Sequence, residues 1–266
     1  TPNKQNFGGN LILALSLAWA RLKAKSENLE LFQYLGGSTS PKLNPSILGG
    51  RTSLKLPRPI FNVINGGAHA KNNLDFQEFQ VIPEIEDFGI ALSVAKEFYR
   101  KLKQFLENKF GKENVSLGDE AGFSAPFNSN EEAIEILAEL IEKYKYPLRI
   151  GLDTAASQFY VPAEASAKAG YLVDGKKYSA DELKEFYLKL IETYNILSIE
   201  DPFYEEDFEN FAKLTAQYGE VRPPDINDNF GRSNLQKLVI TDDLTTTNPV
   251  RLKTAIEKKS GNAVLI

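Results

Sequence analysis

The 266-residue chain contains no cysteine, no methionine and only one histidine, His69. The absence of cysteine excludes disulfide bonds, thiolate nucleophiles and cysteine-ligated metal sites. It is compatible with a reducing compartment, and we expect the protein to be cytoplasmic. Any chemistry at a catalytic site must therefore come from oxygen and nitrogen groups.

Long apolar runs and basic clusters are also missing. The longest apolar run near the start covers residues 11–20, which is too short to span a membrane. Basic residues follow this run, whereas a signal peptide would place them first. The net charge is −5 and no basic cluster is present, so we expect neither a membrane span nor nucleic-acid binding. Small anionic substrates stay possible, because a bound cation can reverse the local charge.

The chain divides by composition into a short helical segment, a connection and a main domain. Apolar residues recur at helical spacing over residues 10–25, which predicts a packed helix. Glycine, proline and serine dominate the connection that follows, which predicts a linker. We therefore assign residues 1–37 to the end of a first domain, 38–56 to the linker and 57–266 to the main domain. Residues 161–177 and 220–236 are predicted to be surface insertions, and no function is assigned to them.

Short apolar strands alternate with amphipathic helices through the main domain. Strands are predicted over residues 148–152, 196–199, 238–240 and 263–266, with helices over 88–110, from about 130, over 180–194, near 206–218 and from 249. This alternation predicts parallel βα units and an α/β barrel. A complete (β/α)8 barrel has eight strands, and this chain supplies about six, so we predict an incomplete barrel. The chain also stops at Ile266 inside the apolar run NAVLI, and we expect the sequence to be a fragment.

Three of the predicted strands end in carboxylates. Asp153 ends IGLD, Glu200 ends LSIE, and Asp242 and Asp243 follow LVIT. A single carboxylate in such a place often only caps the next helix or pairs with a lysine. Three of them at one barrel mouth would repel one another unless cations lay between them. An all-oxygen ligand set favours Mg²⁺, with Mn²⁺ as the next candidate.

Two further stretches carry candidate polar residues. His69 follows the turn in PIFNVINGG, although a lone histidine is more often structural than a ligand. Alternation in DFQEFQVIP places Gln77 and Glu78 on opposite faces unless a bulge intervenes, so we expect one of the two to be functional. Glu120 lies beside Asp119 in the glycine-rich loop GDEAG, where it either points at a ligand or is merely exposed. This loop lacks the phosphate-loop signature.

Five motifs occur in one order along the chain: VINGGAHAKNNLDFQEF, LGDEAGFSAP, IGLDTAASQF, SIEDPF and DDLTTTNP. Together they resemble the enolases, and the likeness covers nearly the whole chain. The acid-sugar lyases and racemases of the wider superfamily lack this combination. The resemblance implies an α/β fold, an enolase-type (β/α)8 TIM barrel preceded by the helical tail of an α+β amino-terminal domain. It also implies a homodimer that uses Mg²⁺ to dehydrate 2-phosphoglycerate reversibly to phosphoenolpyruvate.

The resemblance assigns metal and substrate contacts to individual residues. Asp153, Glu200 and Asp242 resemble the Mg²⁺ ligands, and the last two would also contact the substrate. Gln77 and His69 resemble further substrate contacts. The strand-end carboxylates that strand spacing alone selects are thus the same residues that the resemblance selects as metal ligands.

The resemblance also implies an acid. Glu120 resembles the acid that protonates the departing hydroxyl, and Glu78 the residue that assists it. The loop departs from the usual GDEGG type by Ala121 and by an apparent extra residue, Ser124, and both bear on where Glu120 points. Gln158 stands where a glutamate is more usual.

The general base of the family is a lysine just beyond the strand that here ends at Ile266. It is not among the 266 residues, so we expect these residues alone not to turn over 2-phosphoglycerate, whereas the parent enzyme should be active. Two alternatives stay open. One is a non-catalytic binding or structural protein with the enolase fold, and the other is a different Mg²⁺-dependent lyase or racemase on the same barrel.

Overall fold

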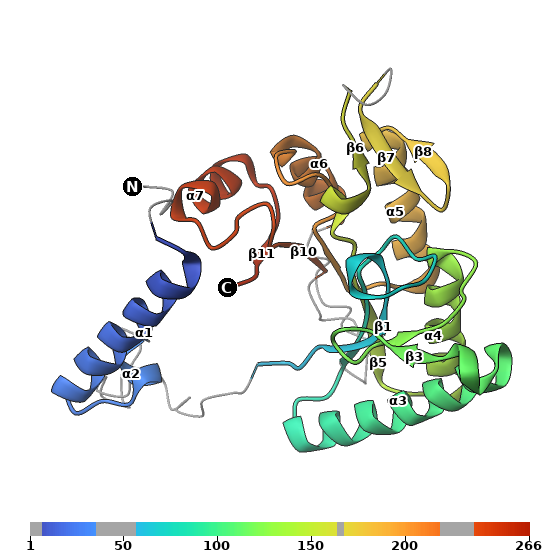
Figure 1. Ribbon diagram of the computed structural model, residues 1–266, viewed down its shortest axis with the longest axis horizontal. Helices are drawn as coiled ribbons and strands as arrows, with labels where there is room; N and C mark the ends of the chain where they lie inside the picture. The colour runs from blue at the N-terminus through green and yellow to red at the C-terminus, as the bar shows by residue number, and fades with distance from the viewer. Residues whose placement is uncertain (1–6, 36–56, 164–167, 219–236) are drawn as a thin grey trace, which may run out of the picture. The chain divides into compact units, whose positions relative to one another are not determined.

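The computed structural model describes residues 7–35, 57–163, 168–218 and 237–266 (Figure 1). The chain divides into two compact units, residues 1–56 and 57–266. The predicted linker over 38–56 and the predicted insertion at 220–236 lie outside the described residues, and so do residues 164–167 of the other insertion.

The first unit contains helix α1 (Gly9–Ser26) and the short helix α2 (Leu31–Leu35). The predicted helix is therefore confirmed, but the prediction that it is packed is wrong for the described residues. Ala24 is the one buried residue of α1, whereas side chains such as Leu15 and Trp19 are exposed. The described part of this unit offers α1 only five-residue α2 as a partner, which is too small to cover an apolar helix.

The second unit is built on one eight-stranded sheet. Its strands are β1 (Phe61–Asn65), β2 (Glu78–Pro83), β3 (Ser116–Leu117), β4 (Phe123–Ser124), β5 (Leu148–Asp153), β9 (Ser198–Glu200), β10 (Leu238–Thr241) and β11 (Ala263–Val264). They are arranged in the order β11-β10-β9-β5-β2-β1-β4-β3. The pairs β5–β9, β9–β10 and β10–β11 are parallel, as predicted.

Strand β2, for which the sequence predicted no direction, is antiparallel to both of its neighbours, β1 and β5. Residues 66–77 connect β1 to β2 and contain only the short 3-10 helix η2 (Gly67–His69). Without a crossover helix the chain reverses direction, as in a hairpin. The reversal places the first residue of β2 at the sheet edge where β1, β5 and β9 end.

One level of strand pairing runs along this edge. Asn65 pairs with Glu78, Glu78 with Asp153, Asp153 with Glu200, and Glu200 with Ile240. Paired residues on adjacent strands lie side by side on one face of a sheet. Three of the predicted site residues are therefore neighbours at a single level of the sheet.

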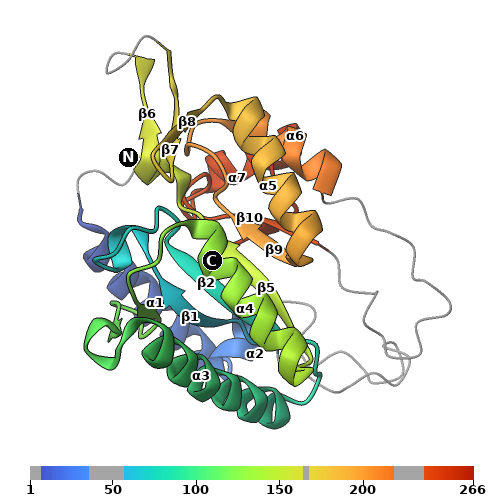
Figure 2. The ribbon, with the colours of Figure 1, turned by 90° about the vertical axis from the view of Figure 1, so that its right-hand side faces the viewer.

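The described part of this unit also contains five helices, of which α3, α4 and α5 can be seen in Figure 2. They are α3 (Phe88–Phe110), α4 (Asn130–Tyr144), α5 (Ala180–Tyr194), α6 (Phe208–Tyr218) and α7 (Pro249–Lys258). Side chains of Asp87, Ser129, Ser179 and Asn248 accept hydrogen bonds from backbone N–H groups in the first turns of four of them. No helix within the described ranges has both the length and the apolar character that crossing a membrane requires.

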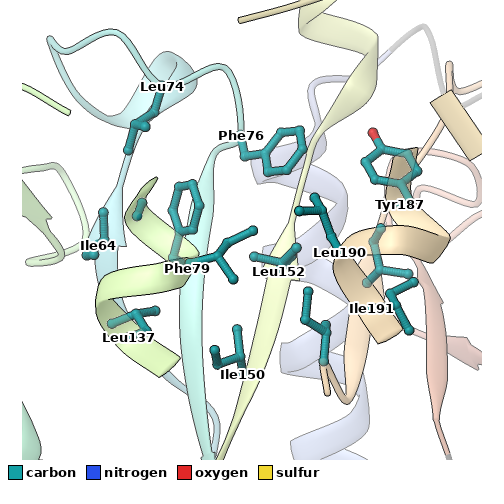
Figure 3. Packing of buried hydrophobic residues seen from close by; sticks show 14 of the residues in the cluster. Ile64, Leu74, Phe76, Phe79, Leu137, Ile150, Leu152, Tyr187, Leu190 and Ile191 are labelled. Atoms are coloured by element: carbon teal, nitrogen blue, oxygen red, sulfur yellow. The ribbon is translucent and has the colours of Figure 1, made fainter. Parts of the chain in front are cut away.

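The apolar core lies between the sheet and these helices. Phe79 of β2 and Leu152 of β5 point toward Leu137 of α4 and Leu190 of α5 (Figure 3). All four side chains are essentially inaccessible to solvent. The face of the sheet that carries Phe79 and Leu152 is thus buried, and the carboxylates that alternate with them point to its other face.

The stretch predicted as a surface insertion at 161–177 is in part a core element. It contributes to a second sheet of β6 (Tyr160–Val161), β7 (Gly170–Val173) and β8 (Lys176–Tyr178). Tyr171 and Val173 are buried within the main core, and the Tyr171 ring makes an edge contact with Phe203 at 6.2 Å. The prediction is therefore wrong for residues 170–173, because alternate side chains of β7 point into the core.

Asn130, at the start of α4, joins three segments that are distant in the sequence. Its Oδ1 accepts hydrogen bonds from the N–H groups of Asp75 and Phe76, each at 3.0 Å. Its Nδ2 donates to Asp75 Oδ2 at 3.2 Å and to Asp174 Oδ1 at 2.8 Å. Asn130 is fully buried, so this network holds the residues that lead into β2 and thereby the position of Glu78.

We expect Asn130→Ala to lower the free energy of unfolding by about 2–4 kcal/mol, because it leaves the N–H groups of Asp75 and Phe76 without an acceptor and creates a cavity in the core. Urea denaturation followed by circular dichroism measures the change. The matched control is Asn114→Ala, which removes an exposed side-chain hydrogen bond to Phe110 and should change stability by less than about 0.5 kcal/mol. Equal losses for the two variants would contradict the structural role of Asn130.

Candidate active site

Five carboxylates gather beyond the ends of β5, β9 and β10. One oxygen from each of Asp153, Glu200 and Asp201 lies within 4.8 Å of the others, and the same holds for Asp201, Asp242 and Asp243. The predicted ligands Asp153, Glu200 and Asp242 therefore fall into two overlapping groups. Asp201 is the member that the two groups share, and either group could hold a metal ion.

Asp201 was not among the predicted site residues, yet it organises this cluster. Its Oδ1 accepts the N–H of Asp242 at 3.1 Å, and its Oδ2 accepts the N–H of Asp243 at 2.8 Å. The residue has a φ of +42°, in the left-handed region, which costs a non-glycine residue about 1–2 kcal/mol. The only signal in the sequence was the second carboxylate of SIEDPF, and that signal does not distinguish a ligand from a residue that holds the next strand.

Burial and mutual repulsion make these carboxyl groups hard to ionise. Burial, with repulsion from Glu200 next, raises the pKa of Asp153 from 3.8 to about 9. Burial, with repulsion from Asp201 next, raises the pKa of Glu200 from 4.5 to about 8. The pKa of Asp201 is raised to about 7, mainly by burial. A divalent cation among these oxygens would favour the ionised forms, so the donor set and its electrostatics fit a hard metal ion.

A second group lies beside the first and contains a pair of hydrogen-bonded carboxyl groups, Glu78 and Glu120. Asn62 Nδ2 donates to Glu120 Oε2 at 2.9 Å, and Gln80 Nε2 donates to Glu78 Oε2 at 2.9 Å. Burial and the hydrogen bond to Glu120 raise the pKa of Glu78 to about 7, whereas the same hydrogen bond lowers the pKa of Glu120. The shared proton therefore lies mainly on Glu78, the more buried member.

His69 faces both members of this pair. Its Nδ1 lies 3.7 Å from Glu78 Oε1 and 3.6 Å from Glu120 Oε2. This nitrogen has no hydrogen-bond partner within the described part of the chain. The backbone oxygen of His69 accepts the N–H of Asp119 at 3.0 Å, which ties η2 to the loop that carries Glu120. Three of the predicted residues are thus brought together.

Gln77 connects the two groups. Its Nε2 donates to Asp153 Oδ2 at 3.1 Å, and its Oε1 accepts from Gln158 Nε2 at 2.5 Å. Gln158 in turn accepts the N–H of Ala68 at 3.1 Å. Because β2 begins at Glu78, strand alternation does not extend to Gln77, and both side chains reach predicted site residues. Gln158 was noted in the sequence only as a departure, whereas the structure shows that it orients the Gln77 amide.

The loop that carries Glu120 is a tight turn. Gly118 donates its N–H to the Gly122 oxygen at 2.8 Å, and Ala121 donates to the Gly118 oxygen at 3.1 Å. Ala121 has a φ of +62°, a conformation that favours glycine. Ser124, the apparent extra residue, lies in β4, and its Oγ accepts from Asn72 Nδ2 at 3.1 Å. With both departures present, Glu120 still reaches Glu78.

We expect the metal-free protein to lose stability as the pH rises. The folded-state pKa values of Asp153 and Glu200 exceed their ordinary values, so the folded protein holds these protons more tightly than the unfolded chain does. The stability that this provides is fully present below about pH 4 and is lost as the pH rises toward 8–9. Urea denaturation in a chelator between pH 5.5 and 9 should show this fall. Glu200→Gln should flatten it and raise the free energy of unfolding at pH 8 by on the order of 2 kcal/mol.

The control for this experiment is Glu185→Gln, which changes an exposed carboxylate on α5. It should retain the pH dependence of the unchanged chain. A metal-free protein whose stability is flat across this range, or rises with pH, would contradict the electrostatic description of the carboxylate cluster.

The chain matches known proteins over its whole length. The family described as "Enolase, C-terminal TIM barrel domain" matches residues 53–266, which confirms the predicted enolase-type barrel. The enolase of Aeropyrum pernix is 40% identical over 271 residues, 100% of this chain and 55% of that protein. The enolase of Methanocaldococcus jannaschii is 39% identical, and that of Corynebacterium kroppenstedtii 38%, over 100% of this chain and 55% and 56% of theirs. The chain spans about half the length of these curated relatives. A family match of this extent means that the chain belongs to the enolase family.

Proposed function

We propose that this chain supplies the metal-binding and acid residues of an enolase, which reversibly dehydrates 2-phosphoglycerate to phosphoenolpyruvate in glycolysis and gluconeogenesis. The observation that carries the proposal is the position of two groups at one sheet edge. One group is the buried carboxylate cluster around Asp153 and Glu200, and the other is the hydrogen-bonded pair Glu78 and Glu120. A reaction that removes a proton and a hydroxyl from adjacent carbons needs charge stabilisation and an acid in this proximity.

Asp153, Glu200 and Asp242 would hold Mg²⁺ in this proposal. Mg²⁺ bound there would stabilise the negative charge that develops on the substrate carboxylate when its weakly acidic α-proton is removed. Asp201 keeps Asp242 in place by accepting the backbone N–H groups of Asp242 and Asp243. Gln77 donates a hydrogen bond to Asp153 Oδ2, and the N–H of Ala155 donates one to the other oxygen, Asp153 Oδ1, at 3.0 Å. The ligand oxygens are thus oriented by the chain itself.

The acid step uses the proton of the carboxyl pair. The side chain of Glu120 is 47% exposed and that of Glu78 is 15% exposed, so Glu120 is the member that a substrate can reach. As the bond between C3 and the hydroxyl oxygen breaks, its electron pair leaves with the oxygen, which takes a proton from Glu120 and departs as water. Before this step Glu78 passes its proton to Glu120 along their hydrogen bond. His69, Gln77, Glu200 and Asp242 would contact the substrate.

Other parts of the proposal rest on the family alone. The resemblance to the enolases implies a homodimeric parent enzyme with a small-molecule substrate, and the composition is compatible with a cytoplasmic location. In the family the base that removes the α-proton is a lysine, and we propose the same kind of base for this reaction. The two alternatives named above are less favoured, because the acid pair and the carboxylate cluster are both present.

Binding of Mg²⁺ tests the metal assignment directly. We expect isothermal titration calorimetry of the 266-residue chain at pH 8 to detect binding, and Asp153→Asn to weaken it at least about ten-fold, because a neutral amide is a poorer ligand for Mg²⁺. Asp181→Asn, an exposed carboxylate on α5, is the control and should bind as the unchanged chain does. Equal affinities for Asp153→Asn and the unchanged chain would contradict the assignment.

Formation of phosphoenolpyruvate, followed by ultraviolet absorbance with Mg²⁺, tests the reaction. We expect no turnover by the 266 residues alone and turnover by the protein expressed from the complete open reading frame. In that protein Glu120→Gln should lower kcat by about 10²–10⁴-fold, as expected for loss of a general acid, while Glu185→Gln leaves it unchanged. Appreciable formation of phosphoenolpyruvate by the 266 residues, or an unchanged kcat in Glu120→Gln, would contradict the proposal.

A further inference from the structure

A single peptide group next to Glu120 is held at both of its ends. The carbonyl oxygen of Ala121 accepts a hydrogen bond from the hydroxyl of Tyr99, on α3, at 2.5 Å. The N–H of Gly122, which belongs to the same peptide group, donates to Asn65 Oδ1, at the end of β1, at 2.8 Å. The two contacts approach the peptide plane from different elements.

The other hydrogen bonds of this turn leave that peptide group unconstrained. The bond from Ala121 to Gly118 holds the preceding peptide group, and the bond from Gly118 to the Gly122 oxygen holds the following one. The orientation of the group between them therefore depends on Tyr99 and Asn65. Rotation of this group changes ψ of Ala121 and φ of Gly122, and it releases the turn that holds the neighbouring Glu120 in place.

Within this turn, the backbone conformation of Ala121 depends on such a restraint. With a φ of +62° it is left-handed, and non-glycine residues remain in this region only where their surroundings impose it. Without the two contacts Ala121 would favour a negative φ. That change would turn Glu120 away from Glu78, its hydrogen-bond partner.

Both holding residues are themselves fixed. The Tyr99 ring stacks on Phe123 of β4 with centroids 4.3 Å apart and planes at 26°, and burial raises the pKa of Tyr99, which keeps its hydroxyl protonated as a donor. Asn65 is fully buried. A side chain at position 122 would lie 2.5 Å from Asn65 Oδ1, so only glycine permits this close approach.

We propose that Tyr99, together with Asn65, is a positioning residue that aims Glu120 at Glu78 by fixing the Ala121–Gly122 peptide group. Tyr99 acts through the backbone, since its hydroxyl bonds to the Ala121 carbonyl, and it is not a catalytic residue. The consequence for catalysis rests on the proposed function of Glu120 as the acid.

Tyr99→Phe tests the proposal because it removes the hydroxyl and retains the stacked ring. In the 266-residue chain, hydrogen exchange measured by nuclear magnetic resonance should show the Gly122 amide exchanging about five-fold faster, as expected for loss of one hydrogen bond. The control is Tyr144→Phe on α4, whose ring is exposed; it should leave Gly122 unchanged. Unchanged Gly122 exchange in Tyr99→Phe would overturn the proposal.

The kinetic arm uses the protein from the complete open reading frame. Tyr99→Phe should lower kcat about five-fold, which corresponds to about 1 kcal/mol at 1.36 kcal/mol per ten-fold, with KM and Mg²⁺ affinity unchanged. Ala121→Gly removes the need for restraint, because glycine adopts positive φ freely. We therefore expect Tyr99→Phe to lower kcat less than two-fold when Ala121→Gly is also present.

A merely structural role for Tyr99 would give a different result. In that case Ala121→Gly would not restore kcat to Tyr99→Phe. Full additivity of the two substitutions in kcat overturns the proposal. If the unchanged protein makes no phosphoenolpyruvate, the proposed function fails, and the exchange of Gly122 alone decides whether Tyr99 holds the loop.

Discussion

Strand pairing at one level of the sheet is the constraint on which the rest of the site depends. It joins Asn65, Glu78, Asp153, Glu200 and Ile240 in one row. The row exists because β2 runs opposite to its neighbours, so its first residue meets the last residues of the others. In a parallel β2, the same edge would receive the proline end of the strand. The direction of one strand thus brings the pair Glu78 and Glu120 to the carboxylate cluster around Asp153 and Glu200.

The same row places several buried carboxyl groups close enough to repel one another when ionised. Buried carboxyl groups at one edge raise each other's pKa values, and the apo protein accommodates them by holding protons on Asp153, Glu200 and Glu78 near neutral pH. Different polar neighbours hold the two groups of carboxylates in place. Asp201 and Gln77 hold the carboxylate cluster, while the amides of Asn62 and Gln80 hold Glu120 and Glu78. A site of this kind is unstable in isolation, and a cation converts its repulsion into binding.

Local features of the fold could be predicted from the sequence because they are written in adjacent residues. Capping residues and apolar spacing predicted the helices, and carboxylates at strand ends predicted which acidic residues gather at the sheet edge. Contacts between distant segments could not be predicted. Alternation in DFQEFQVIP does not encode strand direction, so the antiparallel course of β2 could not be predicted. The same holds for the link from Asn130 to Asp174, 44 residues away, and for the contact of Tyr99 with Ala121. Asp201 was missed because the backbone groups that it accepts lie just after β10, 41 and 42 residues away.

The central claim is that the buried carboxyl groups at this edge form a cation site held neutral by protons. Proton release on Mg²⁺ binding tests it most directly, by calorimetric titration at pH 7 in buffers of different ionisation enthalpy. We predict that about one to two protons leave per Mg²⁺ bound, since the pKa values of Asp153 and Glu200 are about 9 and about 8. The number should fall toward zero as the pH approaches these values and passes them. Binding without proton release at pH 7, or no binding at any pH, would contradict the account.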